Sequence, residues 1–265
     1  IRKGNRMKYD ILESLISVSL KAGSLIRHYY GGKDFKVSEK KDNHDLVTTA
    51  DLESQEIIIN ELSSRFPDIP IIGEEDQHII KREHAFFIDP LDGTLNFVKQ
   101  LPFFTVSIGY WKDNQPVCGV VFDPLRQDLF YARVGMGSYH NGKKLFIRED
   151  DNKSQLLASD WGHDSSHFKK NILVIQQLLK KNSYLFRFMG CASLAICYVG
   201  AGILNGYWHF ALLPWDMAAG VLIAREAGAS VTLLDGEPFD LWQKDILAVA
   251  PHLKDKLLPV LTNIK

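Results

Sequence analysis

Two aspartates lie three residues apart directly after a short apolar run, and this segment constrains the chain more than any other. Residues 85–88 read Ala-Phe-Phe-Ile and predict a buried strand, and Asp89-Pro90-Leu91-Asp92-Gly93-Thr94 follows at once. The proline suits a sharp exit from a sheet, the glycine allows a ligand to approach the backbone closely, and the threonine can open a helical turn. Hard cations take oxygen ligands, and helix N-terminal amides bind anions. The segment therefore predicts a meeting place for Mg²⁺ and phosphate, although an Asp-capped turn explains the same residues one by one.

Other acidic residues also stand at the borders of apolar elements. Asp51 follows a short run at residues 46–50, Glu74 ends the run at residues 69–72, and Asp216 precedes a small-residue stretch at residues 217–220. Taken singly, each of these acids fits a helix cap or a solvated charge. Taken together, they predict carboxylates that a rigid scaffold directs at one shared point.

Chain length and charge limit the possible functions. With 265 residues the chain can form one compact unit, which we divide into an N-terminal α+β half (7–150) and a C-terminal α/β half (151–265). The formal net charge of −1 argues against nucleic acid or an anionic membrane as a partner. No stretch reaches the roughly 18 apolar residues that a membrane span needs. Three scattered cysteines without metal-ligand spacing indicate reduced thiols and a cytoplasmic location.

Hydrophobic periodicity predicts a mixed α/β (α+β) chain. Helices are expected over residues 11–31, 51–66, 168–181, 191–199 and 216–226. Short strands with turn signals are expected between residues 104 and 147, with a hairpin turn at Asn141-Gly142. Further strands are expected at residues 185–187, 230–233 and 246–250. The pattern predicts layered α and β structure with many antiparallel pairs in the first half.

The ordered set of acidic motifs resembles the inositol monophosphatase superfamily of Mg²⁺-dependent, lithium-sensitive phosphatases, over about residues 8–263. The resemblance rests on Asp45-Leu46-Val47-Thr48 with Asp51, on Gly73-Glu74-Glu75, on residues 89–97, and on Trp215-Asp216. It implies a layered αβαβα sandwich with largely antiparallel sheets, like that of the sugar phosphatases, and a homodimer.

The expected metal ligands are all oxygen donors. Four carboxylates without a Cys or His cluster favour Mg²⁺ or Mn²⁺ over zinc. The resemblance implies two or three ions. Glu74, Asp89 and the Leu91 carbonyl would hold the first, while Asp89, Asp92 and Asp216 would hold the second.

The resemblance also implies how the reaction proceeds. A water activated by a metal ion would attack phosphorus, with Asp51 and Thr94 orienting and deprotonating that water beside Glu74. The amides of Gly93 and Thr94 would bind the phosphate. Lys40 matches a basic position on a loop that helps to place a further metal ion, and an ordinary solvated lysine explains it equally well.

The substrate is a small phosphate monoester, and inositol monophosphate is the first expectation. The substrate side is expected to comprise Gly93, Thr94, Asp92, Asp216, Cys191, Ala192 and His209. Inositol-specific relatives carry Glu at the position of His209 and often Ser at that of His163, so strict inositol specificity stays open. Histidinol phosphate, fructose 1,6-bisphosphate, 3′-phosphoadenosine 5′-phosphate and NADP are the alternatives.

Two rival interpretations have different sequence signatures. Phosphatases with an aspartate nucleophile place their two acids two residues apart, whereas Asp89 and Asp92 lie three apart. A non-catalytic regulatory or RNA-associated protein could keep the fold, and loss of a metal carboxylate would be its sign. Every expected carboxylate is present in this chain.

Overall fold

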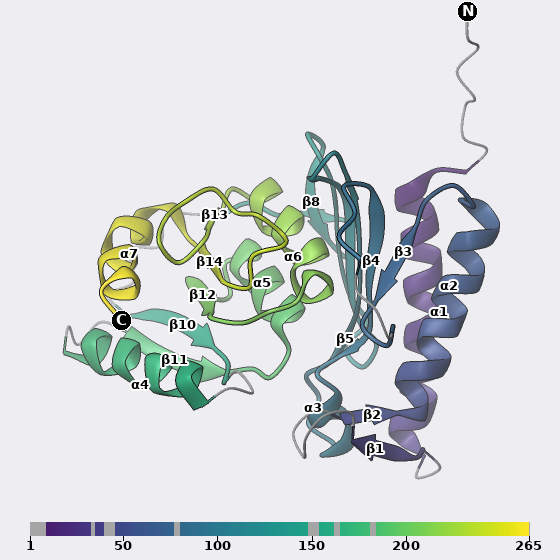
Figure 1. Ribbon diagram of the computed structural model, residues 1–265, viewed down its shortest axis with the longest axis horizontal. Helices are drawn as coiled ribbons and strands as arrows, with labels where there is room; N and C mark the ends of the chain where they lie inside the picture. Colours follow the sequence, from purple (N-terminus) through teal and green to yellow (C-terminus); the bar gives the residue numbers. More distant parts are fainter. Residues whose placement is uncertain are drawn as a thin grey trace, which may run out of the picture.

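The computed structural model describes residues 9–32, 35–39, 46–76, 80–147, 154–161, 165–180 and 184–264. Within these ranges the elements stack in five layers, as Figure 1 shows. In order, the layers are α4 (Ser165–Leu179) with α7 (Lys254–Thr262), a five-stranded sheet, α5 (Ala192–Gly200) with α6 (Pro214–Glu226), a seven-stranded sheet, and α1 (Ile11–Gly31) with α2 (Thr49–Arg65). The expected αβαβα sandwich is confirmed.

The two N-terminal helices begin at polar caps that the sequence provides. The Asp10 carboxylate accepts a hydrogen bond from the Glu13 amide at 3.0 Å, which satisfies one of the free donors in the first turn of α1. Thr48 and Asp51 form a reciprocal capping box at the start of α2. Helix α2 ends at Arg65, two residues before Pro67, so both predicted helices are confirmed to within two residues.

Residues 89–92 lie on the second strand of the seven-stranded sheet, beside the edge strand that runs parallel to it. Its order is β3-β4-β5-β6-β7-β8-β9, in which β3 and β4 are parallel and the other neighbours are antiparallel. Its strands are β3 (Ile71–Gly73), β4 (Ala85–Asp92), β5 (Thr105–Lys112), β6 (Gln115–Asp123), β7 (Asp128–Arg133), β8 (Gly137–His140) and β9 (Lys143–Lys144). The predicted hairpin at Asn141-Gly142 joins the last two strands.

Strand β4 is longer than its apolar run. It continues through Pro90 to Asp92, which pairs with Thr105, and its register is irregular between Asp89 and Asp92. The prediction that the acids follow the end of the strand is therefore wrong by four residues. An irregularity can accommodate proline because the missing amide then breaks no regular ladder bond, and it redirects the neighbouring side chains.

The five-stranded sheet has the order β11-β10-β12-β14-β13. Its strands are β10 (Gln155–Ser159), β11 (Tyr184–Phe188), β12 (Gly206–His209), β13 (Ser230–Thr232) and β14 (Ile246–Val249). Strand β10 pairs in parallel with β11 and β12, whereas β14 pairs antiparallel with β12 and β13. The C-terminal ends of β10, β11 and β12 therefore point the same way. Two smaller elements complete the architecture: the pair β1 (Val37–Glu39) and β2 (Leu46–Thr48), and the 3₁₀ turn η1 (Pro251–Leu253).

Helix α6 lies directly on the seven-stranded sheet because both surfaces are made of small residues. A Cβ added to Gly109 would lie 2.6 Å from the Ala218 Cβ, and one added to Gly119 would lie 2.9 Å from the Ala219 backbone. The Trp111 indole also donates to the Ala218 carbonyl at 3.0 Å. This close contact fixes the position of the first turn of α6, which carries Asp216.

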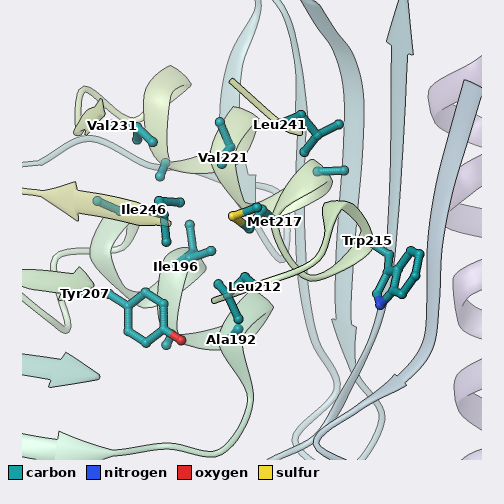
Figure 2. Packing of buried hydrophobic residues seen from close by; sticks show 14 of the residues in the cluster. Ala192, Ile196, Tyr207, Leu212, Trp215, Met217, Val221, Val231, Leu241 and Ile246 are labelled. Atoms are coloured by element: carbon teal, nitrogen blue, oxygen red, sulfur yellow. The ribbon is translucent and has the colours of Figure 1, made fainter. Parts of the chain in front are cut away.

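The other side of the middle layer packs against the five-stranded sheet. Figure 2 shows the apolar cluster between them, with Ile196 of α5, Met217 and Val221 of α6, and Tyr207 and Ile246 of the sheet. None of the described helices is long and apolar enough to cross a membrane.

Candidate active site at the end of strand β4

Two hydrogen bonds hold the irregular end of β4, one within the strand and one from α2. The Leu91 amide donates to Asp89 Oδ1 at 3.1 Å, and the Ser54 hydroxyl of α2 donates to the Pro90 carbonyl at 2.9 Å. Asp89 is 1 % exposed and Asp92 is 9 % exposed. Two carboxylates are therefore buried at one strand end, where their charge needs compensation.

Glu74 reaches Asp89 because β3 and β4 are parallel neighbours. The Glu74 amide donates to the Ile88 carbonyl at 3.1 Å, which continues the ladder by one residue. The turn after it is closed by Asp76, whose Oδ2 accepts the Gly73 amide at 2.7 Å. The Glu74 side chain lies close enough to Asp89 to contribute to the raised pKa of Asp89.

Asp216 comes from the C-terminal half of the chain. Asp216 Oδ2 accepts the Leu213 amide at 2.7 Å, which places the acid in the first turn of α6 behind Pro214. The Ser107 hydroxyl donates to the Trp215 carbonyl at 3.4 Å, and Ser107 is the cross-strand partner of Asp89. Asp216, like Glu74 and Asp92, lies near enough to Asp89 for its charge to act on that carboxyl group.

The electrostatics of Asp89 reflect this convergence. Burial raises the pKa of Asp89 well above its usual range, and the charges of Glu74, Asp92 and Asp216 raise it further. A carboxylate surrounded by like charges in a low-dielectric interior either takes up a proton or requires a cation. The donor set consists of oxygen atoms only, which suits Mg²⁺ or Mn²⁺.

The acidic side chains act on one another's charge, but they are not arranged as metal ligands. Within the part of the chain that the structure describes, no three His, Cys, Asp or Glu side chains form a group that could hold a metal ion as they stand. The residues fit a divalent cation in chemistry and charge, because all the expected side-chain donors are carboxylate oxygens.

Asp51 lies beside this group, hydrogen-bonded to two threonines. Asp51 Oδ2 accepts from the Thr48 amide at 2.8 Å and also from the Thr48 hydroxyl, while Asp51 Oδ1 lies 2.9 Å from the Thr94 hydroxyl. The Thr94 hydroxyl also lies 3.0 Å from the Leu91 carbonyl. Burial raises the pKa of Asp51 to about 6, and the threonine hydrogen bonds limit the rise. The predicted pairing of Asp51 with Thr94 is therefore a direct contact.

Asp92 is held by the start of α5. Its Oδ2 accepts from the Ser193 amide at 2.7 Å, the Ser193 hydroxyl at 2.6 Å and the Cys191 thiol at 3.2 Å. Its Oδ1 accepts the Ala192 amide at 3.3 Å. Burial raises the pKa of Asp92, and these donors counteract the rise. Cys191 and Ala192, which were predicted on the substrate side, thus contact a predicted metal ligand.

Sequence reasoning assigned no role to Ser193, although it directly follows Cys191 and Ala192. Its partner lies 101 positions away in the chain, so no local pattern indicates the contact. The available signal was the neighbouring Cys191, which was expected on the substrate side.

Gly93 occupies a backbone position that other residues rarely adopt. Its φ is +93°, and an added Cβ would lie 2.8 Å from the Phe103 carbonyl oxygen and 3.1 Å from that of Gly190. Thr94 then begins α3 (Thr94–Val98). Asn96 in this short helix donates to the carbonyls of Phe103 and Met189 at 2.8 and 2.9 Å. These contacts join the β4 exit to the segment before α5.

Asp160 is a partly buried acid that sequence reasoning missed. Its Oδ1 accepts the Gly190 amide at 2.6 Å, and its Oδ2 accepts the Tyr207 hydroxyl at 3.0 Å. Burial raises the pKa of Asp160 to about 6. The acid ties the ends of β10 and β11 together just before Cys191, so it supports the segment that holds Asp92.

His209 lies at the end of β12, with its ring buried. Its Nδ1 accepts the Ala211 amide at 2.9 Å, so the proton of the neutral ring resides on Nε2, which can then donate. Lys40 and His163 lie outside the described residues, and Asp45 of the first motif does too.

Comparison with known proteins gives one consistent result. The sequence profile described as the inositol monophosphatase family matches residues 8–265. A protein of Pasteurella multocida named "Nus factor SuhB" is 36% identical over 94% of this chain and 94% of its own length. "Fructose-1,6-bisphosphatase/inositol-1-monophosphatase" of Aquifex aeolicus is 34% identical over 97% of this chain and 96% of its own. The crystal structure of extragenic suppressor protein suhB from Bartonella henselae superposes with a TM-score of 0.88 at 33% identity, covering 96% of this chain and 98% of that one.

Proposed function

This chain belongs to the inositol monophosphatase family, and from that premise we propose that it is a Mg²⁺-dependent phosphate monoester hydrolase acting on a small phosphorylated polyol. Inositol monophosphate is the first candidate substrate. The family establishes a phosphatase, and the identity of the substrate is our proposal. Fructose 1,6-bisphosphate is the nearest alternative, because the Aquifex aeolicus relative is named for both activities.

One observation carries the proposal. The carboxylates of Glu74, Asp92 and Asp216 all raise the pKa of the buried Asp89, although they come from the turn after β3, from β4 and from α6. A fold that gathers like charges in its interior loses stability unless these charges are compensated. Binding of a divalent cation is the compensation that this oxygen-only set favours.

We assign the metal ligands accordingly. Glu74, Asp89 and the Leu91 carbonyl would hold one Mg²⁺, and Asp89, Asp92 and Asp216 would hold a second. Bound Mg²⁺ would neutralise phosphate charge and acidify a nearby water. Mn²⁺ could substitute, because it takes the same oxygen ligands.

The residues of the chain then prepare the attacking water. Thr94 has one hydroxyl proton, and its two possible acceptors, Asp51 Oδ1 and the Leu91 carbonyl, lie at 2.9 and 3.0 Å. The lone pairs of Thr94 therefore remain able to accept a hydrogen bond from water. Asp51, with its pKa raised to about 6, is matched to accept the proton near neutral pH.

The backbone after Asp92 would receive the phosphate. Gly93 allows the close approach, and the amides of Gly93 and Thr94 are the proposed donors. His209 and Ala192 are proposed to face the organic part of the substrate. A donating imidazole at position 209 would recognise a hydroxyl or carboxylate differently from a glutamate, which is why the substrate ranking needs direct measurement.

The test is a panel of phosphate monoesters assayed with and without Mg²⁺. Ranking kcat/KM over inositol, histidinol, fructose and nucleotide phosphates should place a polyol phosphate first, with activity lost on chelation. Chelator-insensitive turnover would contradict the metal assignment. A trapped phosphoenzyme in rapid-quench experiments would indicate an aspartate nucleophile instead of direct attack by water.

A regulatory role is a second candidate, favoured by the name "Nus factor SuhB" that relatives at 36% and 34% identity carry. The two functions can coexist in one chain. An active-site variant such as Asp92→Asn separates them, because it should remove hydrolysis and leave any regulatory binding intact. A protein that hydrolyses no small phosphate monoester at any Mg²⁺ concentration would make the regulatory role the leading one.

A further inference from the structure

Asp92 receives hydrogen bonds of unequal strength from the first turn of α5. Three of its four donors converge on Oδ2, namely the Ser193 amide at 2.7 Å, the Ser193 hydroxyl at 2.6 Å and the Cys191 thiol at 3.2 Å. Oδ1 receives only the longer bond from the Ala192 amide, at 3.3 Å, among the described residues. Lone pairs for a further partner therefore remain mainly on Oδ1.

A buried hydroxyl stands behind Ser193. Thr105 is fully buried, and its Oγ1 lies 2.7 Å from Ser193 Oγ and 3.6 Å from Cys191 Sγ. Each hydroxyl has one proton to donate. Because Ser193 gives its proton to Asp92, the short contact at 2.7 Å requires Thr105 to donate to Ser193. The hydrogen bonds thus run in one direction, from Thr105 through Ser193 to Asp92.

The residue types at the start of α5 make Ser193 the principal side-chain donor. Cys191 is the N-cap of α5 and makes no side-chain capping bond, whereas a serine, threonine or aspartate usually fills such a position. A thiol is a weak donor, and its bond to Asp92 is the longest of those that reach Oδ2. The strong hydroxyl donor stands two residues later, at Ser193.

We propose that Ser193, backed by Thr105, is the positioning residue that orients Asp92 for cation binding, replacing a hydroxyl that this chain lacks at Cys191. The inference rests on the proposed function, because it takes Asp92 as a metal ligand. Because three donors occupy Oδ2, Oδ1 is the oxygen of Asp92 that remains available to bind the cation. Ser193 itself touches neither the cation nor the substrate.

The first test is Ser193→Ala, with Ser19→Ala as the matched control. Partners that orient a metal ligand typically contribute about 10–100-fold to metal affinity or activity. The apparent Mg²⁺ affinity, measured by calorimetry, should fall by roughly this factor, and the Tm of the metal-free protein should fall too. Ser19 is also fully buried, and its hydroxyl has no hydrogen-bond partner among the described residues, so its loss should leave Mg²⁺ affinity unchanged and should not lower the Tm. Unchanged Mg²⁺ affinity in Ser193→Ala would overturn the proposal.

The second test restores the hydroxyl at the other position. In the double variant C191S/S193A, a hydroxyl at position 191 is placed to donate to the same oxygen of Asp92. Mg²⁺ affinity and metal-free Tm should recover to within about threefold and about 2 °C of the original protein. Losses that add up, without recovery, would show that Ser193 only fills space.

Further variants keep the result decisive. If Ser193→Ala does not fold, the folding of C191S/S193A supports the proposal, and failure of both contradicts it. Thr105→Val keeps the side-chain volume and removes the donor behind Ser193, and it should weaken Mg²⁺ binding by about threefold, less than Ser193→Ala does. A Thr105→Val protein with unchanged affinity would remove Thr105 from the chain of hydrogen bonds.

The outcome is separable from that of the proposed function. The Tm measurements use metal-free protein and require no turnover. If the unaltered protein hydrolyses no phosphate monoester, the proposed hydrolase fails, while loss and recovery of metal-free Tm still decide whether Ser193 holds Asp92.

Discussion

Asp89 and Asp92 lie on the same strand, yet acidic side chains surround Asp89 and hydrogen-bond donors surround Asp92. Around Asp89 the neighbours are acidic, and Glu74, Asp92 and Asp216 all raise its pKa. Around Asp92 the start of α5 supplies two amides, a hydroxyl and a thiol. Donors from α5 offset part of the cost of burying Asp92, whose pKa is still raised, whereas the acidic neighbours of Asp89 add to the cost of burying it. The comparison teaches that two acids on one strand can receive very different support from the surrounding protein.

The largest expected effect is on turnover. Asp89→Asn and Asp92→Asn each remove one metal charge without removing volume, and each should lower kcat by at least about 10³-fold, because transition-state charge on phosphate would lose its counter-ion. Phosphate release with saturating substrate measures the effect. Asp113→Asn is the control, because Asp113 is exposed and its φ of +54° suits asparagine. Near-normal kcat in either variant would refute its ligand assignment.

Thr94→Ala should have the next largest effect. Removing the hydroxyl leaves Asp51 without the partner at 2.9 Å that helps to orient water, so kcat should fall by about 10²-fold with little change in KM. Thr94→Ser keeps the hydroxyl and should retain most of the rate. A rise in KM at unchanged kcat would make Thr94 a binding residue only, and it would limit the comparison to the two aspartates.

The sharpest test of the comparison is the stability of metal-free protein. Asp89→Asn removes a buried charge that its neighbours repel, so it should raise the free energy of unfolding by about 1–2 kcal/mol. Asp92→Asn weakens charge-assisted bonds to α5, so it should lower stability by a similar amount. Thermal melts in chelator should show Tm shifts of opposite sign, about 2–4 °C per kcal/mol. Shifts of the same sign would show that the two environments do not differ as described.

The smallest effect concerns pH and the support behind Asp92. The pKa of Asp160 is about 6 in the fold and 3.8 in its absence, so this acid favours the folded state below pH 3.8 and loses that contribution as pH rises through 6. Asp160→Asn should therefore gain free energy of unfolding relative to the original protein between about pH 4 and pH 6, by roughly 1–2 kcal/mol because the carboxyl is partly exposed. Paired melts across that range measure the difference. A constant difference at every pH would assign the effect of the substitution to packing alone.

The sequence predicted the elements that have long periodic faces. Helices α1 and α2 begin within two residues of their predicted starts, because Asp10 and Thr48 cap them and apolar residues recur at helical spacing. Strands β10 and β12 were not predicted, because they are short, buried on both faces and show no alternation. The helix α7 was also missed, and Pro259 inside it is a residue that ordinarily argues against a helix.

The candidate site, like the fold, was predictable from the sequence only in part. The acids stood out because their type and their position at element borders are visible along the chain. The supporting hydrogen bonds did not, because Ser193 and Asp160 meet partners that only the tertiary fold brings close. The contact between Gly190 and Asp160 spans 30 positions, and that between Ser193 and Asp92 spans 101. Ligand types are therefore readable from sequence, whereas the residues that orient them require coordinates.

The glycines beneath α6 have a consequence for how the enzyme comes into being. Asp216 reaches the other acids only when Ala218 and Ala219 settle against Gly109 and Gly119, so the two halves must dock before a complete ligand set exists. Under the proposed function, a half-folded chain would lack the complete set of acids that binds Mg²⁺. Completion of the fold and the onset of activity would then be one event.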